Sequence, residues 1–443
     1  MFKRSFGFDA DEGRSMIERT HVEFYSTVLK PDPSRTVVRP FEPGYPRGFD
    51  QGHSRTEDTV ALIVGLGADE LARQLDGVTA SLDENHRDVD ATLLRRFSEM
   101  ANQIASAKTL SLDQQRLIGA YFSQEYAYEA AALFNPSAVA HPDQTGLAKG
   151  SIRFVLALRG VGEGHVSSVT FRTGVWTPGG ALTIDDPGPT SVAPVITPQD
   201  GSTSSVHLDC GGSRSISETV LFPVLPSQRQ GIEDMRLVRF TEDDGSVTYH
   251  GTYTAFSGAE VRSELLTTLD FKSFDMRALT GDVASAKGMA LFPRQIDGRY
   301  VTLGRQDNRN IWLNISADLL NWENGTKLVE PRYPWEFIQM GNCGSPIELA
   351  EGWLVMTHGV GTVRNYCIGA CLLDKADPSK LLARTPRPIL APSPHERDGY
   401  VPNVVYSCGG LVHDRSMLLP YAVADSFTAF GTLSIDNLLA CME

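Results

Sequence analysis

An acidic pair, Glu233 and Asp234, is the feature of this sequence best placed to do chemistry. An alternating segment at 237–240, a turn with Asp and Gly at 243–246 and a second alternating run at 249–254 are typical of a β-hairpin. The pair therefore lies where the chain enters a strand, and a carboxylate there is held rigidly and can point into a cleft. The structural alternative is an ion pair between Asp234 and Arg236.

Two more charged residues lie at the ends of predicted strands. Arg159 ends an apolar run, 154–158, and precedes a glycine-rich stretch at 160–165. A charge at the end of an apolar run needs a partner. Arg159 therefore either forms a structural salt bridge or binds substrate hydroxyls through its guanidinium group. Asp425 closes the last strand beside Tyr421, where a carboxylate can accept hydrogen bonds from vicinal hydroxyls.

Three basic residues complete the set of candidates. Lys287 lies at the start of a strand, and Arg305 and His358 lie at the ends of strands. Each one alone fits a structural role, because charged strand ends are common. Together they would form a cationic pocket opposite Asp234.

The elements that position these residues change along the chain. Residues 1 to about 55 are rich in Pro, Arg and Phe, which predicts an extended arm. Apolar residues recur three and four apart from about 56 to 133, which predicts amphipathic helices, the last of them at 112–133 and capped by Ser111 or Asp113. Strand patterns fill the rest, so we expect a region of arm and helices at 1–133 and a β domain at 134–443.

Five segments of the β domain share a plan of a polar start, a strand, a tight turn and a second strand. They begin at 134, 231, 287, 344 and 401, and the last three starts are just under 60 residues apart. Such a period is typical of propeller blades, so we predict an all-β, five-bladed β-propeller with an N-terminal α-helical extension. The polar strand starts would then converge on one funnel. We expect residues 176–230 to be an irregular insertion at its rim.

Composition excludes several classes of function. The net charge of -14 argues against a nucleic-acid partner, which is bound mainly through phosphate neutralisation. No stretch reaches the roughly 18 apolar residues of a membrane span, and no signal peptide is evident. The six cysteines lack the spacing of a zinc site, so we expect reduced cysteines, no metal and a cytoplasmic location.

Several motifs, in order, resemble glycoside hydrolase family 130. Asn135 in Phe-Asn-Pro, Asp234 in Glu-Asp-Met-Arg and Lys287 ahead of Leu-Phe-Pro carry the resemblance. It continues in the motifs at 310–322, 352–360, 399–403 and 421–425, and so covers about 134 to 430. The family implies a five-bladed β-propeller and inverting chemistry on β-mannosides, by phosphorolysis or hydrolysis.

The resemblance also implies roles for individual residues. Asp234 would be the general acid, and the mannosyl unit at the cleaved bond would be held by Asn135, Arg159 and Asp425. The phosphate site would contain Lys287, with Arg305 and His358 as further candidates. Where similar phosphorylases carry an Arg and a His, this chain has Gly258 and Gly304, and Arg262 could substitute.

Phosphorolysis and hydrolysis make different demands. An inverting hydrolase needs a second carboxylate to activate water, for which Glu163, Glu260 and Glu264 are candidates. A phosphorylase needs cations that neutralise and aim phosphate. We therefore expect a β-mannoside phosphorylase that makes mannose 1-phosphate, acts on β-1,2-linked mannooligosaccharides and uses no cofactor besides inorganic phosphate as co-substrate. The alternatives are an inverting β-1,2-mannosidase and a non-catalytic sugar-binding propeller, and the N-terminal helices could build a homo-oligomer.

Overall fold

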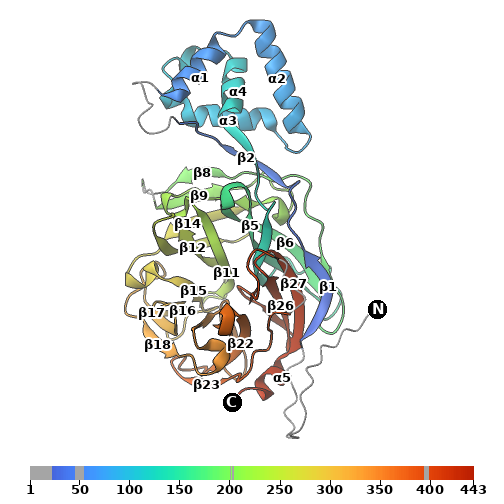
Figure 1. The fold of residues 1–443 in the computed structure, drawn as a ribbon, viewed down its shortest axis with the longest axis vertical. Helices are drawn as coiled ribbons and strands as arrows, with labels where there is room; N and C mark the ends of the chain where they lie inside the picture. Colours follow the sequence, from blue (N-terminus) through green and yellow to red (C-terminus); the bar gives the residue numbers. More distant parts are fainter. Residues whose placement is uncertain (1–21, 45–53, 200, 202–203, 394–398) are drawn as a thin grey trace.

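The computed structural model describes residues 22–44, 54–199, 201, 204–393 and 399–443 (Figure 1). Within these ranges the chain is mostly β, with one group of helices at one end (Figure 1). No helix in the described ranges is long and apolar enough to cross a membrane.

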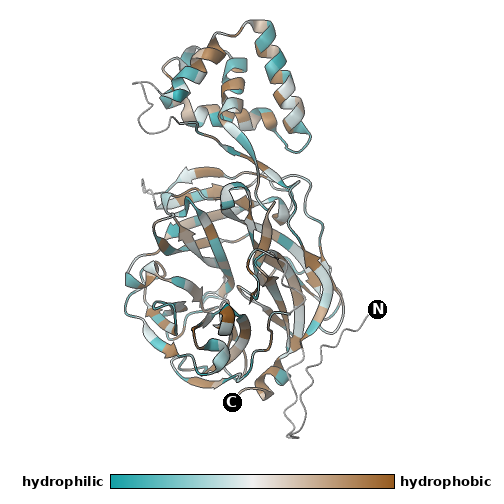
Figure 2. Cartoon of the chain, viewed as in Figure 1, coloured by the Kyte–Doolittle hydropathy of each residue, from teal (hydrophilic) through white to brown (hydrophobic). Residues whose placement is uncertain are grey.

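The helical group has the elements that the apolar spacing predicted, with one correction. Its helices are α1 (Arg55–Val64), α2 (Ala68–Asp83), α3 (Val89–Met100) and α4 (Leu112–Tyr121). Ser111 caps α4 by accepting a hydrogen bond from the backbone N–H of Gln114, as expected. The prediction of helix to residue 133 is wrong, because residues Ser123–Ala127 form strand β3 and pair with β2 (Thr36–Pro40). Figure 2 shows hydrophilic and hydrophobic residues mixed along each helix, in keeping with one buried face per helix.

The extended arm takes part in the β structure. Strand β1 (Glu23–Leu29) pairs antiparallel with β27, so the beginning and the end of the described chain share one sheet (Figure 1). The segments β1 and β2 of the predicted arm are extended strands, and residues 1–21 and 45–53 of the arm lie outside the described residues.

The remaining strands form five antiparallel groups, each with four main strands. The first two groups are β4 (Ala132–Ala140), β5 (Ile152–Val161), β6 (Ser167–Trp176) and β7 (Leu182–Ile184), then β11 (Gly231–Thr241), β12 (Val247–Phe256), β13 (Val261–Thr268) and β14 (Ser273–Ala278). The third is β15 (Lys287–Leu291), β16 (Tyr300–Arg305), β17 (Ile311–Ser316) and β18 (Thr326–Val329). The fourth and fifth are β19 (Gln339–Asn342), β21 (Trp353–Val360), β22 (Tyr366–Leu373) and β23 (Leu381–Arg384), then β24 (Val405–Tyr406), β26 (Ser416–Val423), β27 (Phe427–Ser434) and β1.

Short elements complete this pattern. One parallel contact, between Gly231 and Ser167, joins the first two groups into a single 11-stranded sheet. Strands β10 (Val220–Leu221), β20 (Ile347–Glu348) and β25 (Leu411–His413) pair with β6, β21 and β26. Helix α5 (Ile435–Ala440) follows β27. The predicted hairpin is confirmed, since β11 and β12 pair on either side of the turn at 243–246.

Two predictions about the β region need correction. The segment 176–230 is not irregular throughout, because β9 (Ser205–Asp209) pairs with β14 and β8 (Val195–Pro198) pairs with β9, which extends the second group by two strands. They lie on the edge opposite β11, toward the helices (Figure 1). The fourth group starts with β19 at Gln339, not at the predicted residue 344, because a strand of four residues that includes Gly341 gives a weak pattern.

Candidate active site

The site is built on an irregularity that recurs in three strands. Asn135 in β4 and Asp234 in β11 both have left-handed backbones, with φ of 49° and 53°, and each lies where the strand pairing shifts register. Gly288 in β15 has φ of 82° at a third such shift. A bulge of this kind redirects side chains that would otherwise alternate between the faces of a sheet. It explains why the consecutive carboxylates of Glu233 and Asp234 share one partner.

That partner is Arg159, near the end of β5. Its Nη2 lies 2.9 Å from Oε1 of Glu233, and its Nη1 lies 3.4 Å from Oδ1 of Asp234. The side-chain amide of Asn135 donates to the same Asp234 oxygen at 2.6 Å. Asn135, Arg159 and Asp234 therefore form one cluster, although they come from three strands.

The basic residues extend this cluster on the side of the third group. Nζ of Lys287 lies 3.4 Å from Oε2 of Glu233. Lys287 also pairs in register with Arg305 on the neighbouring strand β16. Nη1 of Arg305 lies 3.3 Å from Nε2 of His358. Three residues predicted to form a cationic pocket are thus linked to each other or to Glu233.

Space for the Arg305 side chain comes from two glycines. A Cβ atom on Gly288 would lie 2.8 Å from Nε of Arg305, and one on Gly341 would lie 2.3 Å from its Cδ. His358 is completely buried, and burial together with Arg305 and Arg236 holds its pKa well below the usual value. A neutral imidazole can accept a hydrogen bond from the guanidinium of Arg305, which a charged one cannot.

Arg236 does not form the side-chain ion pair that was the structural alternative for the acidic motif. It is 1% exposed and donates to the main-chain carbonyls of Asp234 and Cys343, each at 2.9 Å. A third hydrogen bond, also of 2.9 Å, goes to the hydroxyl of Tyr406. Arg236 therefore fixes the backbone of the bulge, a role that sequence reasoning missed. The available signal was a charged residue between the apolar residues Met235 and Leu237 of β11.

Asp425 joins the cluster from the turn between β26 and β27. It follows Ala424, and both residues have left-handed backbones with φ near 50°. Burial raises the pKa of Asp425 to about 6, the charge of Asp234 adds to this, and Arg159 and Arg364 act in the opposite direction. Asp425 is therefore close enough to Asp234 and Arg159 to be affected by both charges.

The acid candidate itself is ionised in the free site. Burial alone would raise the pKa of Asp234, but the charges of Arg159, Arg236 and Lys287 and the hydrogen bond from Asn135 outweigh it and hold the pKa below its usual value. A general acid must carry a proton when it acts, so bound ligands with negative charge would have to shift this balance.

Other predicted residues are not in this cluster. Arg262 donates to the carbonyl of Leu279 at 2.8 Å. The candidate base Glu264 is completely buried, and it accepts hydrogen bonds from Ser227, Gln228 and Tyr253 at 2.6, 2.8 and 2.9 Å. These contacts indicate a structural role for this carboxylate. The two remaining candidates, Glu163 and Glu260, are exposed in turns between strands.

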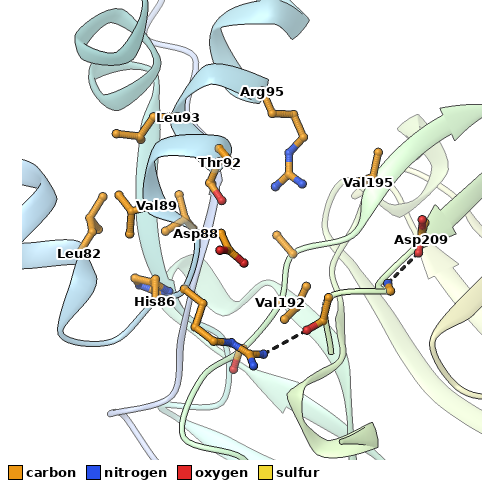
Figure 3. Close-up of a pocket in the computed structure, with 17 residues that line it drawn as sticks. Leu82, His86, Asp88, Val89, Thr92, Leu93, Arg95, Val192, Val195 and Asp209 are labelled. Carbon is orange, nitrogen blue, oxygen red and sulfur yellow. Dashed lines mark hydrogen bonds between the residues drawn. The ribbon is translucent and has the colours of Figure 1, made fainter. Parts of the chain in front are cut away.

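A separate cavity of about 360 Å³ lies between α3 and the segments that flank β8 and β9 (Figure 3). Leu82, Val89, Val192 and Val195 provide apolar walls, and Arg95 points toward it. None of the predicted site residues lines this cavity. In the described part of the chain, no group of three or more His, Cys, Asp and Glu side chains could hold a metal ion.

Comparison with known proteins shows which family the chain belongs to. Residues 213–443 match the sequence profile of the glycoside hydrolase 130 family, which is described as β-1,4-mannooligosaccharide phosphorylase. The chain belongs to glycoside hydrolase family 130. The match includes Asp234, Lys287, Arg305, His358 and Asp425, and it begins after Asn135, Arg159 and the helices.

Characterised relatives have similar sequences over about half of this chain. A 1,2-β-oligomannan phosphorylase from Thermoanaerobacter sp. (strain X514) is 34% identical over 225 residues, which cover 49% of this chain and 74% of the relative. A β-1,2-mannobiose phosphorylase from Listeria innocua is 33% identical over 234 residues, 50% of this chain and 63% of that protein.

Solved structures support the fold. The β-1,2-mannobiose phosphorylase from Listeria innocua in complex with β-1,2-mannobiose superposes with a TM-score of 0.52 at 23% identity, over 70% of this chain and 92% of that one. A family 130 structure from work on glycoside hydrolases that target β-1,2-mannosidic linkages in Candida mannan has a TM-score of 0.50 at 20% identity, over 70% and 86% of the two chains.

Proposed function

We propose that this protein is an inverting phosphorylase that cleaves β-mannosides, of which β-1,2-linked mannooligosaccharides fit best, with inorganic phosphate. Family membership supports an enzyme that acts on β-mannosides. The preference for β-1,2 linkages rests on the names of relatives that are 33 to 34% identical.

In this mechanism Asp234 donates its proton to the glycosidic oxygen, directly or through a sugar hydroxyl. The bond between that oxygen and the anomeric carbon breaks while a phosphate oxygen attacks the carbon from the opposite face. The products are α-mannose 1-phosphate and a sugar shortened by one mannosyl unit. Phosphate is already an anionic nucleophile, so no catalytic base is required.

The remaining residues of the cluster bind the two substrates. Asn135, Arg159 and Asp425 surround Asp234 on the side of the first and fifth groups, and they would hold the mannosyl unit. Lys287 and Arg305 lie on the side of the third group, where they would neutralise phosphate. A guanidinium gives planar, paired hydrogen bonds and an ammonium gives a compact charge, and phosphate sites use both.

One observation carries the choice of phosphorolysis over hydrolysis. Arg305 forms no ion pair with a carboxylate among the described residues, and its contact is with a neutral histidine. A partly buried guanidinium without a counter-ion, placed beside Lys287, favours an anionic ligand.

Hydrolysis is the second candidate, and the carboxylates around Asp234 are the observation in its favour. An inverting hydrolase needs a base about 6.5–9.5 Å from its acid. Of the bases expected from sequence, Glu264 is enclosed by its hydrogen-bond partners. Asp425, with its pKa raised to about 6, would be the group to test instead.

We also propose a five-bladed propeller for the β domain. The five antiparallel groups, the strand β1 that completes the last of them and the bridges between Ser137 and Gly409 and between Tyr366 and Val404 support this arrangement. Residues 134–443, completed by β1, would form the propeller, and α1 to α4 an extension on it. A cytoplasmic location fits a product whose charge retains it in the cell.

The test is digestion of β-1,2-mannobiose with and without inorganic phosphate, with mannose 1-phosphate and free mannose measured separately. Cleavage that requires phosphate and yields mannose 1-phosphate supports the proposal. Free mannose formed at the same rate without phosphate identifies a hydrolase. Saturable binding without turnover under either condition identifies a non-catalytic sugar-binding protein.

A further inference from the structure

Glu233 contacts a cation on each side of the site. Its Oε1 lies 2.9 Å from Nη2 of Arg159, on the sugar side. Its Oε2 lies 3.4 Å from Nζ of Lys287, on the phosphate side. The side chain is 17% exposed, so it is largely shielded from solvent. One carboxylate thus bridges the two cations that flank Asp234.

The geometry points to Glu233 as a positioning residue that partly neutralises Arg159 and Lys287, so that the adjacent Asp234 can take up the proton it must donate. This inference rests on the proposed function, because it assigns Glu233 to the work of the same acid. Glu233 acts through its neighbours and need not touch either substrate.

The charges around Asp234 show why such a residue is needed. Three cations act on Asp234, from β5, β11 and β15: Arg159, Arg236 and Lys287. Together with the hydrogen bond from Asn135 they favour the carboxylate form of Asp234, which is the wrong form for a general acid. A negative charge that pairs with two of these cations weakens that preference.

The other groups near Asp234 do not do this work. The fifth group contributes Tyr406 and Cys408, whose pKa values burial raises, so that both stay neutral, and Asp425, which is partly protonated near neutral pH. The third and fourth groups contribute Arg305 and the neutral His358, which contact each other. On β12, His250 packs against Phe240 farther along the hairpin. Glu233 is therefore the carboxylate in direct contact with two of the three cations that lower the pKa of Asp234, Arg159 and Lys287.

The bulge at Asp234 makes this arrangement possible. In a regular strand, residues 233 and 234 would point to opposite faces of the sheet. The left-handed backbone at Asp234 and the shifted pairing between Glu233 and Arg236 bring both carboxylates to the same guanidinium. A carboxylate one residue before the acid is thus placed to counter the charges of its partners.

The test follows the protonation of Asp234 itself, which does not require turnover. Protein labelled with ¹³C at the aspartate carboxyl groups is titrated with pH and followed by NMR. The signal that is absent from the spectrum of Asp234→Asn belongs to Asp234 and reports its protonation. We expect Glu233→Gln to move the midpoint of this titration down by about one pH unit, as loss of a neighbouring negative charge does. Glu233→Asp keeps the charge and should restore most of the difference.

A matched control is Glu351→Gln, which removes a carboxylate from the exposed ion pair with Arg415, 2.8 Å long. It should leave the midpoint unchanged. An unchanged midpoint in Glu233→Gln, or an equal change in Glu233→Asp, overturns the inference. The high-pH limb of kcat/KM should move with the midpoint, and a lower kcat with an unmoved limb also counts against it. If the wild-type protein titrates as expected yet forms no mannose 1-phosphate, the proposed function fails while the charge relation stands.

Discussion

Replacement of Asp234 by Asn is the most direct test of the site. Asn has the same shape as Asp, and its side-chain oxygen can still accept the 2.6 Å hydrogen bond from Asn135 and contact Arg159. It cannot donate the proton that the leaving oxygen needs. General acid catalysis contributes roughly 10²- to 10⁴-fold, so the variant should lose that much kcat on β-1,2-mannobiose, or about 3–5 kcal/mol of transition-state stabilisation.

The assay compares two substrates that differ in their need for the acid. An aryl β-mannoside with a nitrophenolate leaving group departs without protonation, so Asp234→Asn should cleave it at a rate within about tenfold of wild type. The melting temperature should change by only about 4 °C or less, because the hydrogen-bond geometry is kept. Glu351→Gln, at the exposed ion pair with Arg415, serves as the control with unchanged rates.

Two results would refute this reasoning. Near-normal cleavage of β-1,2-mannobiose by Asp234→Asn would show that another residue is the acid. Equal losses on both substrates, with the melting temperature retained, would show that Asp234 binds the sugar or the phosphate and does not supply the proton.

Three further predictions concern charged residues, two of them in the site and one in a buried ion pair outside it. Arg305→Ala should raise the KM for phosphate by about 10- to 100-fold, because it removes one charge-assisted hydrogen bond to phosphate. The KM for the mannoside should change less. Equal changes in both KM values would show that Arg305 does not belong to a phosphate site. Between about pH 4 and 6 the folded state binds more protons at Asp425 than the unfolded state does, so the free energy of unfolding falls as pH rises. Urea titrations should show that the stability of Asp425→Asn increases relative to wild type as pH rises through this range. A constant difference in stability between the two proteins would contradict the prediction. Glu129 is completely buried and pairs with Arg172 at 2.5 Å and with Arg35 at 3.1 Å. Glu129→Gln should therefore lower the free energy of unfolding by about 3–5 kcal/mol, because it leaves two guanidinium groups without a counter-ion. A loss below about 1 kcal/mol would show that water solvates the two guanidinium groups in place of the carboxylate.

Local patterns in the sequence predicted local structure well. The hairpin of β11 and β12 and the Ser111 cap of α4 depend on residues within a few positions of each other. The end of α4 could not be predicted in this way. Its apolar spacing continues after Tyr121, but the strand pairing of residues 123–127 with β2 replaces the helix, and β2 lies far away in sequence.

Long-range pairing also explains what was missed in the β domain. Strands β8 and β9 lie in a stretch rich in Gly, Pro, Ser and Thr, whose composition is typical of irregular structure. They are strands because β9 pairs with β14, far away in sequence, and β8 pairs with β9. The candidate site residues were predicted from their types, their places at strand ends and the family resemblance, and their roles stay predictions. Their contacts depend on how separate strands meet, which no spacing along the chain reveals. An ion pair between Asp234 and Arg236 was the structural alternative for the same reason, but Arg236 binds main-chain oxygens.

The three bulges offer a physical reason for the residue types at the centre of the site. Asn135, Asp234 and Gly288 occupy corresponding places in β4, β11 and β15, and all three have left-handed backbones. Asn, Asp and Gly are the residue types that adopt this conformation at least cost. Two of these types also carry polar side chains, and the third carries none.

The same backbone irregularity therefore has two effects in the three strands. In β4 and β11 it brings an amide and a carboxylate within 2.6 Å of each other. In β15 the missing side chain of Gly288 leaves room for Arg305, since a Cβ atom there would lie 2.8 Å from its Nε. Any larger residue at Gly288 would both strain the backbone and displace the guanidinium. The strained positions thus determine where the acid and the cation lie, and a substitution at Gly288 should damage the proposed phosphate site without touching Asp234.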